Sequence, residues 1–226
     1  MGVLIVGAPR AQTPPGAPNN SDLELVQRLV QARKEYQTIL ERIRAHYLQT
    51  GDLERAKWAE EELRQYHRLP QHAFRPDLDV PPPTLSGDAN IPDANKLFTR
   101  AMTYKDKGFG TDYLDNQRRA EILFQQLLTQ HPQSDKISDV AFMLGDIYES
   151  KAYKQPYRAV EYYHRCYQWN PRTTHEARIR AARIYDKHLH NRAKAIEVYR
   201  EVTTHETDTR RIQEAQKRIS ELSGTK

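Results

Sequence analysis

The residues best suited to chemistry in this sequence lie in one stretch, 144–171, which holds the chain's single cysteine among tyrosines, a histidine and a tryptophan. Cys166 follows His164 by two positions, and an imidazole beside a thiol is one arrangement that makes cysteine nucleophilic. On a helix, residues two apart point in directions about 200° apart, so these two side chains cannot pair locally. The spacing therefore predicts that Cys166 is a small buried filler.

Two other groups could hold a ligand. His188 and His190 could share a metal ion, but no third ligand stands at a suitable spacing, so exposed loop histidines are favoured. The segment 107–112 contains two glycines, yet it lacks the preceding strand and the following Lys-Ser/Thr pair of a phosphate-binding loop. The sequence therefore predicts no metal, no cofactor and no catalytic centre, and the chain is predicted not to be an enzyme.

The composition fits an elongated helical protein. Its 226 residues are 38% hydrophobic and 29% charged, a balance typical of arrays in which each layer buries only two faces. The formal net charge of +5 is uneven, since residues 172–200 carry eight Lys or Arg against three acidic residues. One cysteine excludes an intrachain disulfide and a cysteine-rich zinc site. No run approaches the roughly 18 apolar residues of a transmembrane helix, so no membrane span is predicted.

The first twenty residues differ from the rest of the chain. Residues 1–20 hold four prolines and show no periodicity, so they are predicted to be a disordered tail or the remnant of a secretory signal. The apolar run 3–6 fits such a remnant, although it is short and no basic region precedes it. On this basis an exported, periplasmic location is favoured over a cytoplasmic one.

Helical periodicity begins at residue 21. Apolar residues recur at intervals of three and four through 21–69, with Gly51 and Asp52 as stop and restart signals, which predicts a long antiparallel helix hairpin. Residues 70–94 contain six prolines and are predicted to be either a semi-rigid linker or an ordered strap along a helical surface. Residues 95–206 are helical and repetitive, and residues 207–226 are predicted to form a capping helix and tail.

The repeats share a pattern of small and aromatic residues. In each of three units a small residue is followed three positions later by tyrosine, and an alanine is followed four positions later by an aromatic residue. Small residues let facing helices approach closely and the rings fill the adjoining gaps, so each unit is predicted to be a helix hairpin stacked on its neighbours. The predicted packing residues are Ala101, Tyr104, Ala120, Phe124, Gly145, Tyr148, Ala159, Tyr163, Ala182, Tyr185, Ala195 and Tyr199.

This pattern resembles the tetratricopeptide repeat (TPR), in which Leu-Gly-x-x-Tyr, Ala-x-x-x-Phe and Pro occur in the same order with a period of about 34 residues. Leu144-Gly145-x-x-Tyr148 matches the first motif letter for letter, and proline follows two of the three units. The steps between tyrosines, 44 and 37 residues, are longer than the family's. The hairpin 21–69 resembles a degenerate repeat. The segment Phe124 to Ser134, followed by Ala141, Leu144-Gly145-x-x-Tyr148 and Ala159, is similar in repeat style to bacterial periplasmic proteins of the outer-membrane assembly lipoprotein and cell-division coordinator kind.

The resemblance implies an α-solenoid of stacked antiparallel helix hairpins, whose first helices line a concave groove that binds other proteins. Phe98, Phe142 and Ile179 would then form an apolar strip between charged flanks, suited to an extended or helical peptide; alternatively, these three join the core. Carried over by spacing, the groove residues are Phe98, Met102, Lys105, Asp139, Phe142, Asp146, Glu149, Ile179 and Arg183.

Two functions follow. The leading prediction is a noncatalytic TPR scaffold that binds another protein or a peptide segment through this groove, in a bacterial cell envelope. The alternative is binding of nucleic acid or an anionic surface through the basic third repeat, around Arg178, Arg180 and Arg183. Acidic residues interrupt that patch and no aromatic platform lies within it, so nucleic acid is the less favoured partner. The oligomeric state stays open.

Overall fold

The computed structural model describes residues 22–69 and 71–224, and these residues form an all-helical protein. The expected tail, residues 1–20, lies outside the described residues, as do residues 225 and 226. The described ranges contain no strand, and an isolated bridge joins Ala89 to Ser134. The all-α class predicted from periodicity is confirmed. The helices are α1 (Leu23–Thr50), α2 (Leu53–Arg68), α3 (Pro76–Asp79), α4 (Pro92–Tyr104), α5 (Thr111–Gln130), α6 (Ile137–Glu149), α7 (Pro156–Trp169), α8 (Ala177–Lys187), α9 (Arg192–His205) and α10 (Thr209–Ser223).

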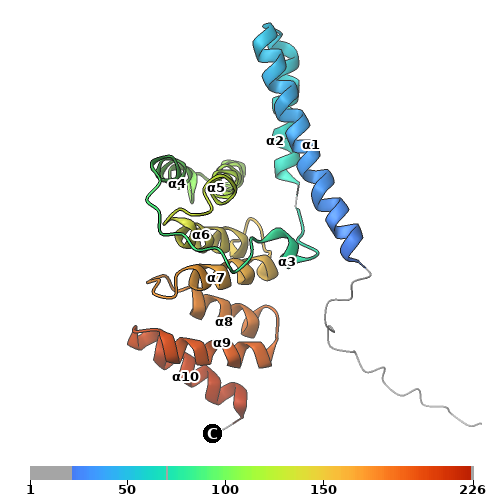
Figure 1. Cartoon of the computed structure of the whole chain (residues 1–226). Helices are drawn as coiled ribbons and strands as arrows, with labels where there is room; N and C mark the ends of the chain where they lie inside the picture. Colours follow the sequence, from blue (N-terminus) through green and yellow to red (C-terminus); the bar gives the residue numbers. More distant parts are fainter. Residues whose placement is uncertain (1–21, 70, 225–226) are drawn as a thin grey trace, which may run out of the picture.

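Helices α1 and α2 form an antiparallel hairpin that stands beside the other helices (Figure 1). Gly51 ends α1 in the left-handed conformation, with φ at 78°, which glycine adopts without a steric penalty. Asp52 caps α2, and its side chain accepts a hydrogen bond of 3.0 Å from the Arg55 amide. The hairpin has little core of its own. The side chains that its two helices bury are Val26, Leu40, Ala56 and Ala59.

The proline-rich segment between the hairpin and α4 is an ordered strap, one of the two possibilities that the sequence leaves open. It includes α3 and runs along α7 before it reaches α4 (Figure 1). Arg165 Nε donates to the carbonyl oxygen of Pro81 (2.6 Å), and Trp169 Nε1 donates to that of Pro82 (3.0 Å). Proline lacks an amide donor but keeps its carbonyl acceptor, so such a segment can bind donors on a helix surface. Helix α4 begins at Pro92, three residues before the expected boundary, because proline suits the first turn.

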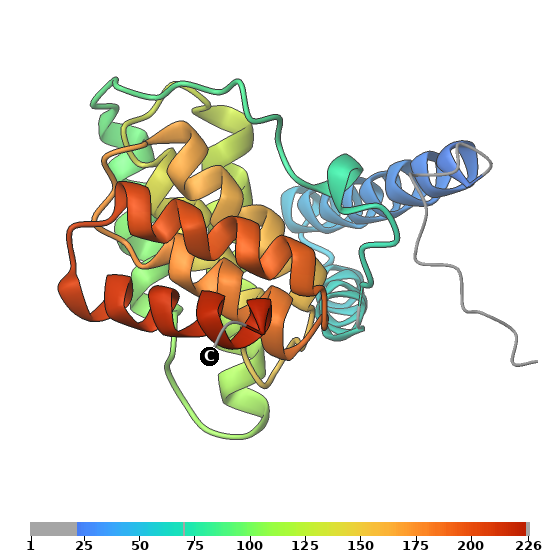
Figure 2. The same ribbon diagram turned by 90° about the horizontal axis from the view of Figure 1, so that it is seen from below.

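Helices α4 to α10 stack in a column, and each packs against the next along the chain (Figure 1). Seen from below, α9 and α10 lie side by side at the end of the column, while α1 projects away from it (Figure 2). One continuous hydrophobic core runs through the column, from Val80 to Ala215. Of the predicted packing residues, Tyr104 and Tyr185 are half-buried and the others are buried.

Gly145 shows why a small residue precedes the tyrosine in the repeat pattern. A Cβ atom added at this position would lie only 2.6 Å from Cδ1 and Cε1 of Tyr163. Helices α6 and α7 can therefore pack at this distance only because the side chain of residue 145 is a hydrogen atom. The tyrosine ring of one helix fills the space that the glycine of the other leaves.

Candidate functional site

Cys166 and His164, the pair with the most reactive side chains, lie apart on α7. Cys166 is fully buried, with Sγ 3.5 Å from Ser138 Oγ, and burial raises the pKa of the thiol to about 11. The His164 ring packs instead against the ring of Tyr185, and burial lowers its pKa to about 4. At neutral pH the thiol is protonated and enclosed, so Cys166 is not placed to act as a nucleophile.

Of the apolar strip predicted for the groove, Ile179 takes the alternative place in the core, which corrects its assignment as a groove residue. Ile179 is fully buried, so it presents no surface to a peptide. Phe98 is half-buried against the ring of Phe124, and Phe142 is half-buried and stacks on the imidazole of His175 with 4.3 Å between ring centroids. Both rings pack against the core and keep part of their surface accessible, as large aromatic side chains can. Met102, with 37% of its surface exposed, is the most accessible of the predicted apolar groove residues.

The charged residues predicted for the groove form ion pairs between successive layers, here called the interlayer ladder. Asp146 on α6 pairs with Lys105 at the end of α4 and with Arg180 on α8, whose Nη1 lies 2.6 Å from Asp146 Oδ1. Burial alone would raise the pKa of Asp146, but the hydrogen bonds and charges of Lys105 and Arg180 outweigh it and hold that pKa below its usual value. The remaining ion pairs of the ladder are Arg180–Glu149 (3.0 Å), Arg183–Glu214 (2.6 Å) and Arg218–Asp186 (2.6 Å), and a hydrogen bond joins His175 Nε2 to Asp139 Oδ1 (2.9 Å).

The arginines of the basic third repeat are engaged within the protein. Arg178 is 4% exposed, lies over the ring of Tyr167 with 4.6 Å to the centroid, and approaches Glu206 to 3.8 Å. Arg180 and Arg183 belong to the interlayer ladder. A phosphate backbone would have to displace these contacts before it could bind, and that weakens the electrostatic case for nucleic acid.

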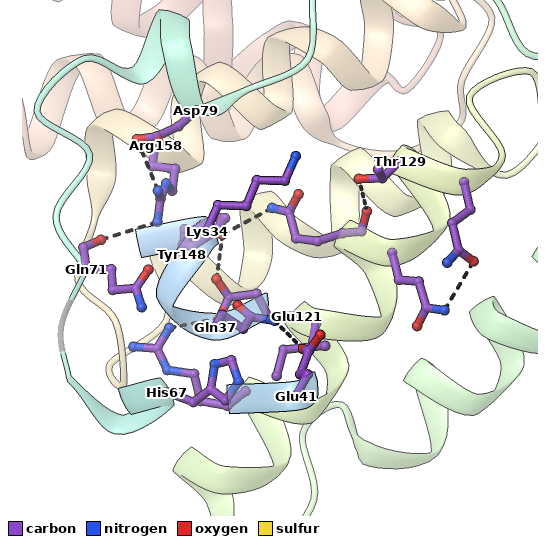
Figure 3. A pocket seen from close by; sticks show the side chains of 15 residues that line it. Lys34, Gln37, Glu41, His67, Gln71, Asp79, Glu121, Thr129, Tyr148 and Arg158 are labelled. Atoms are coloured by element: carbon purple, nitrogen blue, oxygen red, sulfur yellow. Dashed lines mark hydrogen bonds and ion pairs between the residues drawn. The ribbon is translucent and has the colours of Figure 1, made fainter. Parts of the chain in front are cut away.

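A cleft of about 560 Å³ lies between the hairpin and the column, and it is called the hairpin cleft below (Figure 3). Helix α1 forms one wall and α5 forms the other, while α2, α6, α7 and the strap each contribute side chains. Its lining is rich in amide and charged groups and includes one aliphatic side chain, Ile122. The lining residues are Lys34, Gln37, Glu41, His67, Gln71, Asp79, Arg118, Glu121, Ile122, Gln125, Gln126, Thr129, Gln130, Tyr148 and Arg158.

The carboxylate of Glu121 lines the hairpin cleft and accepts hydrogen bonds from three side chains. Tyr148 Oη donates to Glu121 Oε1 (2.6 Å), Tyr153 Oη donates to Glu121 Oε2 (2.5 Å), and Arg118 Nη1 donates to the same oxygen (2.8 Å). Burial alone would raise the pKa of Glu121, but the Arg118 charge and the three hydrogen bonds lower it below its usual value. Glu121 is therefore held ionised and is not poised to donate a proton at neutral pH.

The walls of the hairpin cleft carry both hydrogen-bond donors and hydrogen-bond acceptors. Gln37 donates to Glu41 on α1 (2.8 Å), and Gln126 donates to Gln130 on α5 (3.1 Å). Gln125 reaches inward instead, and its amide nitrogen donates to Tyr162 Oη (2.6 Å). Amides and carboxylates present both donors and acceptors, which is what the main chain of a peptide requires.

Sequence reasoning missed the hairpin cleft. Its residues come from the hairpin, the strap and three helices of the column, so no local motif joins them. Glu121 and Gln125 lie one turn apart on α5, but Arg118 and Gln126 are polar neighbours on the same helix, so the pair does not stand out from an ordinary solvated face.

Comparison with known proteins adds no assignment: none of the models of protein families matches the chain, and none of the curated protein sequences does. Within residues 22–69 and 71–224, no group of three His, Cys, Asp or Glu side chains is arranged to hold a metal ion. In the same part of the chain, none of the helices has both the length and the apolar character that crossing a bilayer demands.

Proposed function

We propose that this chain is a noncatalytic scaffold of the TPR-like α-solenoid type, which binds a segment of another protein in the hairpin cleft. The all-helical column of paired helices and the close approach at Gly145 support the repeat assignment. The similarity in repeat style favours a bacterial cell envelope as its location. The proposal moves the binding site from the first helices of the repeats to the opposite part of the molecule.

The observation that carries the proposal is the lining of the hairpin cleft. Its walls belong to two separately packed units, so a bound segment would bridge the hairpin and the column. Five glutamines, Lys34 and Glu41 supply donors and acceptors along the cleft, and an extended peptide has unpaired amide and carbonyl groups that match them. The interlayer ladder, in contrast, has its charged groups already paired with each other.

The proton chemistry of the cleft favours binding over catalysis. A general acid needs a raised pKa and a general base needs an accessible lone pair near neutral pH. The carboxylate of Glu121 is held ionised by its donors, so it is not a general acid, and both of its oxygens already accept hydrogen bonds. Arg158, a cationic residue of the cleft, forms an ion pair with Asp79, with 3.1 Å between Nη2 and Oδ2. These groups stabilise the fold of the cleft and leave the amides to meet a ligand.

The test compares three single variants in capture experiments from the source organism. Gln126→Trp places a bulky ring on the cleft wall, Met102→Glu alters the predicted groove, and Gln213→Trp is a matched control on the exposed side of α10. Circular dichroism establishes that all three fold. Loss of the same partner with Gln126→Trp alone supports the cleft. Loss with Met102→Glu alone would assign binding to the groove instead, and loss with none would reject both sites.

A further inference from the structure

The exposed large apolar side chains of the protein are concentrated on the hairpin and not on the column. Of those in the described part of the chain, most lie between residues 22 and 69, and six are on α1. Helix α1 has 28 residues, yet it buries only Val26 and Leu40. A helix of this length with so small a buried face normally has a further surface that covers its apolar stripe.

The exposed side chains of α1 follow a strict heptad spacing. Intervals of four and three residues alternate from position 25 to position 43, and such alternation places all six side chains on one narrow seam of an α-helix. Every position on the seam is exposed, with 68% for Leu25 and 54% for Ile39 at the upper end. The residues of this α1 seam are Leu25, Leu29, Ala32, Tyr36, Ile39 and Ile43.

Helix α2 covers only one flank of the α1 seam. The ring of Tyr36 packs against that of Tyr66 with 5.3 Å between centroids, which places α2 beside the seam and not over it. Trp58 of α2 and Leu69, which follows α2, are 60% and 62% exposed and line a groove of about 590 Å³ with the two tyrosines and with Glu61, Glu62 and Gln65. The groove adjoins the α1 seam at Tyr36 and adds Trp58 and Leu69 to its apolar surface. It does not open into the hairpin cleft, which α1 lines with Lys34, Gln37 and Glu41.

We propose that the α1 seam pairs with the α1 seam of a second copy of this chain, in antiparallel orientation, so that two hairpins form a four-helix bundle. Knobs-into-holes packing of the two heptad seams would bury the central side chains of the seam, Tyr36, Ile39 and Ile43, which the single chain leaves in water. An isologous contact of this kind closes after two copies, so it gives a dimer and not a fibre. The two columns would lie at opposite sides of the bundle.

The size of the face suits a dimer. A strip about 10 Å wide along roughly 42 Å of helix presents on the order of 400 Å² per chain from α1. Trp58 and Leu69 extend this area toward the roughly 800 Å² that each partner contributes to a standard interface. A smaller apolar partner, such as a single short helix, would leave part of the seam exposed.

Charge complementarity selects the antiparallel register. Glu35 and Arg42 precede seam positions 36 and 43 by one residue, and in an antiparallel pair these flanking positions face their counterparts. The register that opposes Glu35 to Arg42 of the second copy also sets Tyr36 against Ile39 and Ala32 against Ile43, and it places Leu25 and Leu29 opposite Thr50 and His46. By symmetry the ion pair forms twice. A shift by one heptad would pair all six seam positions, but it would oppose Glu35 to Glu35 and Arg28 to Arg42, which is repulsive.

The first test measures association directly. Sedimentation of the full chain over a wide range of concentration is expected to show a monomer–dimer equilibrium. Ile39→Glu puts a charge in the middle of the seam and is expected to weaken the dimer by about a hundredfold or more. Ala45→Glu adds the same charge on an exposed position of α1 outside the seam, and should leave the dimer within about threefold of the native chain. A chain that is monomeric throughout, or variants that behave alike, would overturn the proposal.

The second test addresses orientation. Glu35→Arg and Arg42→Glu are each expected to weaken the dimer by up to about tenfold, while the double variant restores it. Cysteine placed at Ile39 should be cross-linked between copies by a short bismaleimide, whereas cysteine at Leu25 should not, because antiparallel pairing separates the two Leu25 positions by roughly 35–40 Å. The native Cys166 is buried and serves as the background control. Cross-linking at both positions would reveal a parallel dimer and refute the antiparallel arrangement.

Discussion

Glu121 offers the sharpest test of how the hairpin cleft is built, through the substitution Glu121→Gln. The native carboxylate accepts hydrogen bonds from Arg118, Tyr148 and Tyr153, and the side chains of Glu121 and Arg118 are only 13% and 10% exposed. The amide keeps the shape but removes the charge, so Arg118 loses its counter-ion in a poorly hydrated site. Breaking a buried pair in this way costs about 3–5 kcal/mol, and the residual exposure reduces the expected loss to about 2–4 kcal/mol.

Urea unfolding followed by circular dichroism measures this loss. Glu197→Gln is the matched control, because Glu197 is 56% exposed and contacts Lys194 at 2.8 Å, and the expected change is within about 0.5 kcal/mol. The pKa of Glu121 is lowered in the folded chain from an ordinary value of 4.5, so its contribution is present above pH 4.5 and is lost as pH falls through the folded pKa. The difference in the free energy of unfolding between the native and Glu121→Gln chains should become smaller as the pH falls. A cost no larger than the control's, or a gap independent of pH, would refute the reasoning.

Three further outcomes are expected. Gly145→Ala should lower the free energy of unfolding by about 1–2 kcal/mol in thermal melts, because the clash of its Cβ with the Tyr163 ring outweighs the gain in helix propensity; a stabilised variant would contradict this. Cys166 should react with a maleimide only as fast as the chain unfolds, since it is enclosed and its pKa is raised to about 11, and prompt labelling seen by mass spectrometry would disprove its burial. Nuclear magnetic resonance should show His164 titrating with a pKa of about 4, below its ordinary value of 6.5. The free energy of unfolding should therefore decline as the pH falls from 6.5 to 4, and His164→Leu should flatten that decline. An ordinary pKa in the folded chain would argue against the buried ring.

The helices and their packing residues could be predicted from the sequence because they depend on local spacing. Gly51 and Asp52 specify the turn of the hairpin by their own backbone and capping preferences, and Gly145 with Tyr148 repeats a pattern that one helix turn imposes. The path of the proline-rich strap could not be predicted in this way. Whether the strap packs on the column depends on Arg165 and Trp169, more than eighty residues away in the sequence, and its proline content does not distinguish a free linker from a packed strap.

The groove prediction erred at Ile179 for a related reason. Spacing places a residue on one side of a helix, but it does not determine how closely the next layer approaches. Here α8 sits close enough to bury Ile179 completely, while Asp146 meets Lys105 and Arg180 from the layers on either side. The hairpin cleft could not be predicted at all, because it exists only after the hairpin docks beside α5.

The strap also governs the order in which the molecule can be assembled. Repeat columns fold through neighbour contacts, but the hydrogen bonds of the strap join residues 84 and 87 positions apart. During synthesis the hairpin leaves the ribosome first, yet the helix that anchors the strap is not complete until Trp169 has been added. The hairpin is therefore made well before its strap can be anchored on α7. A nascent polypeptide stalled after α5 could pair Arg68 with Asp115, but it would lack every hydrogen bond between the strap and α7.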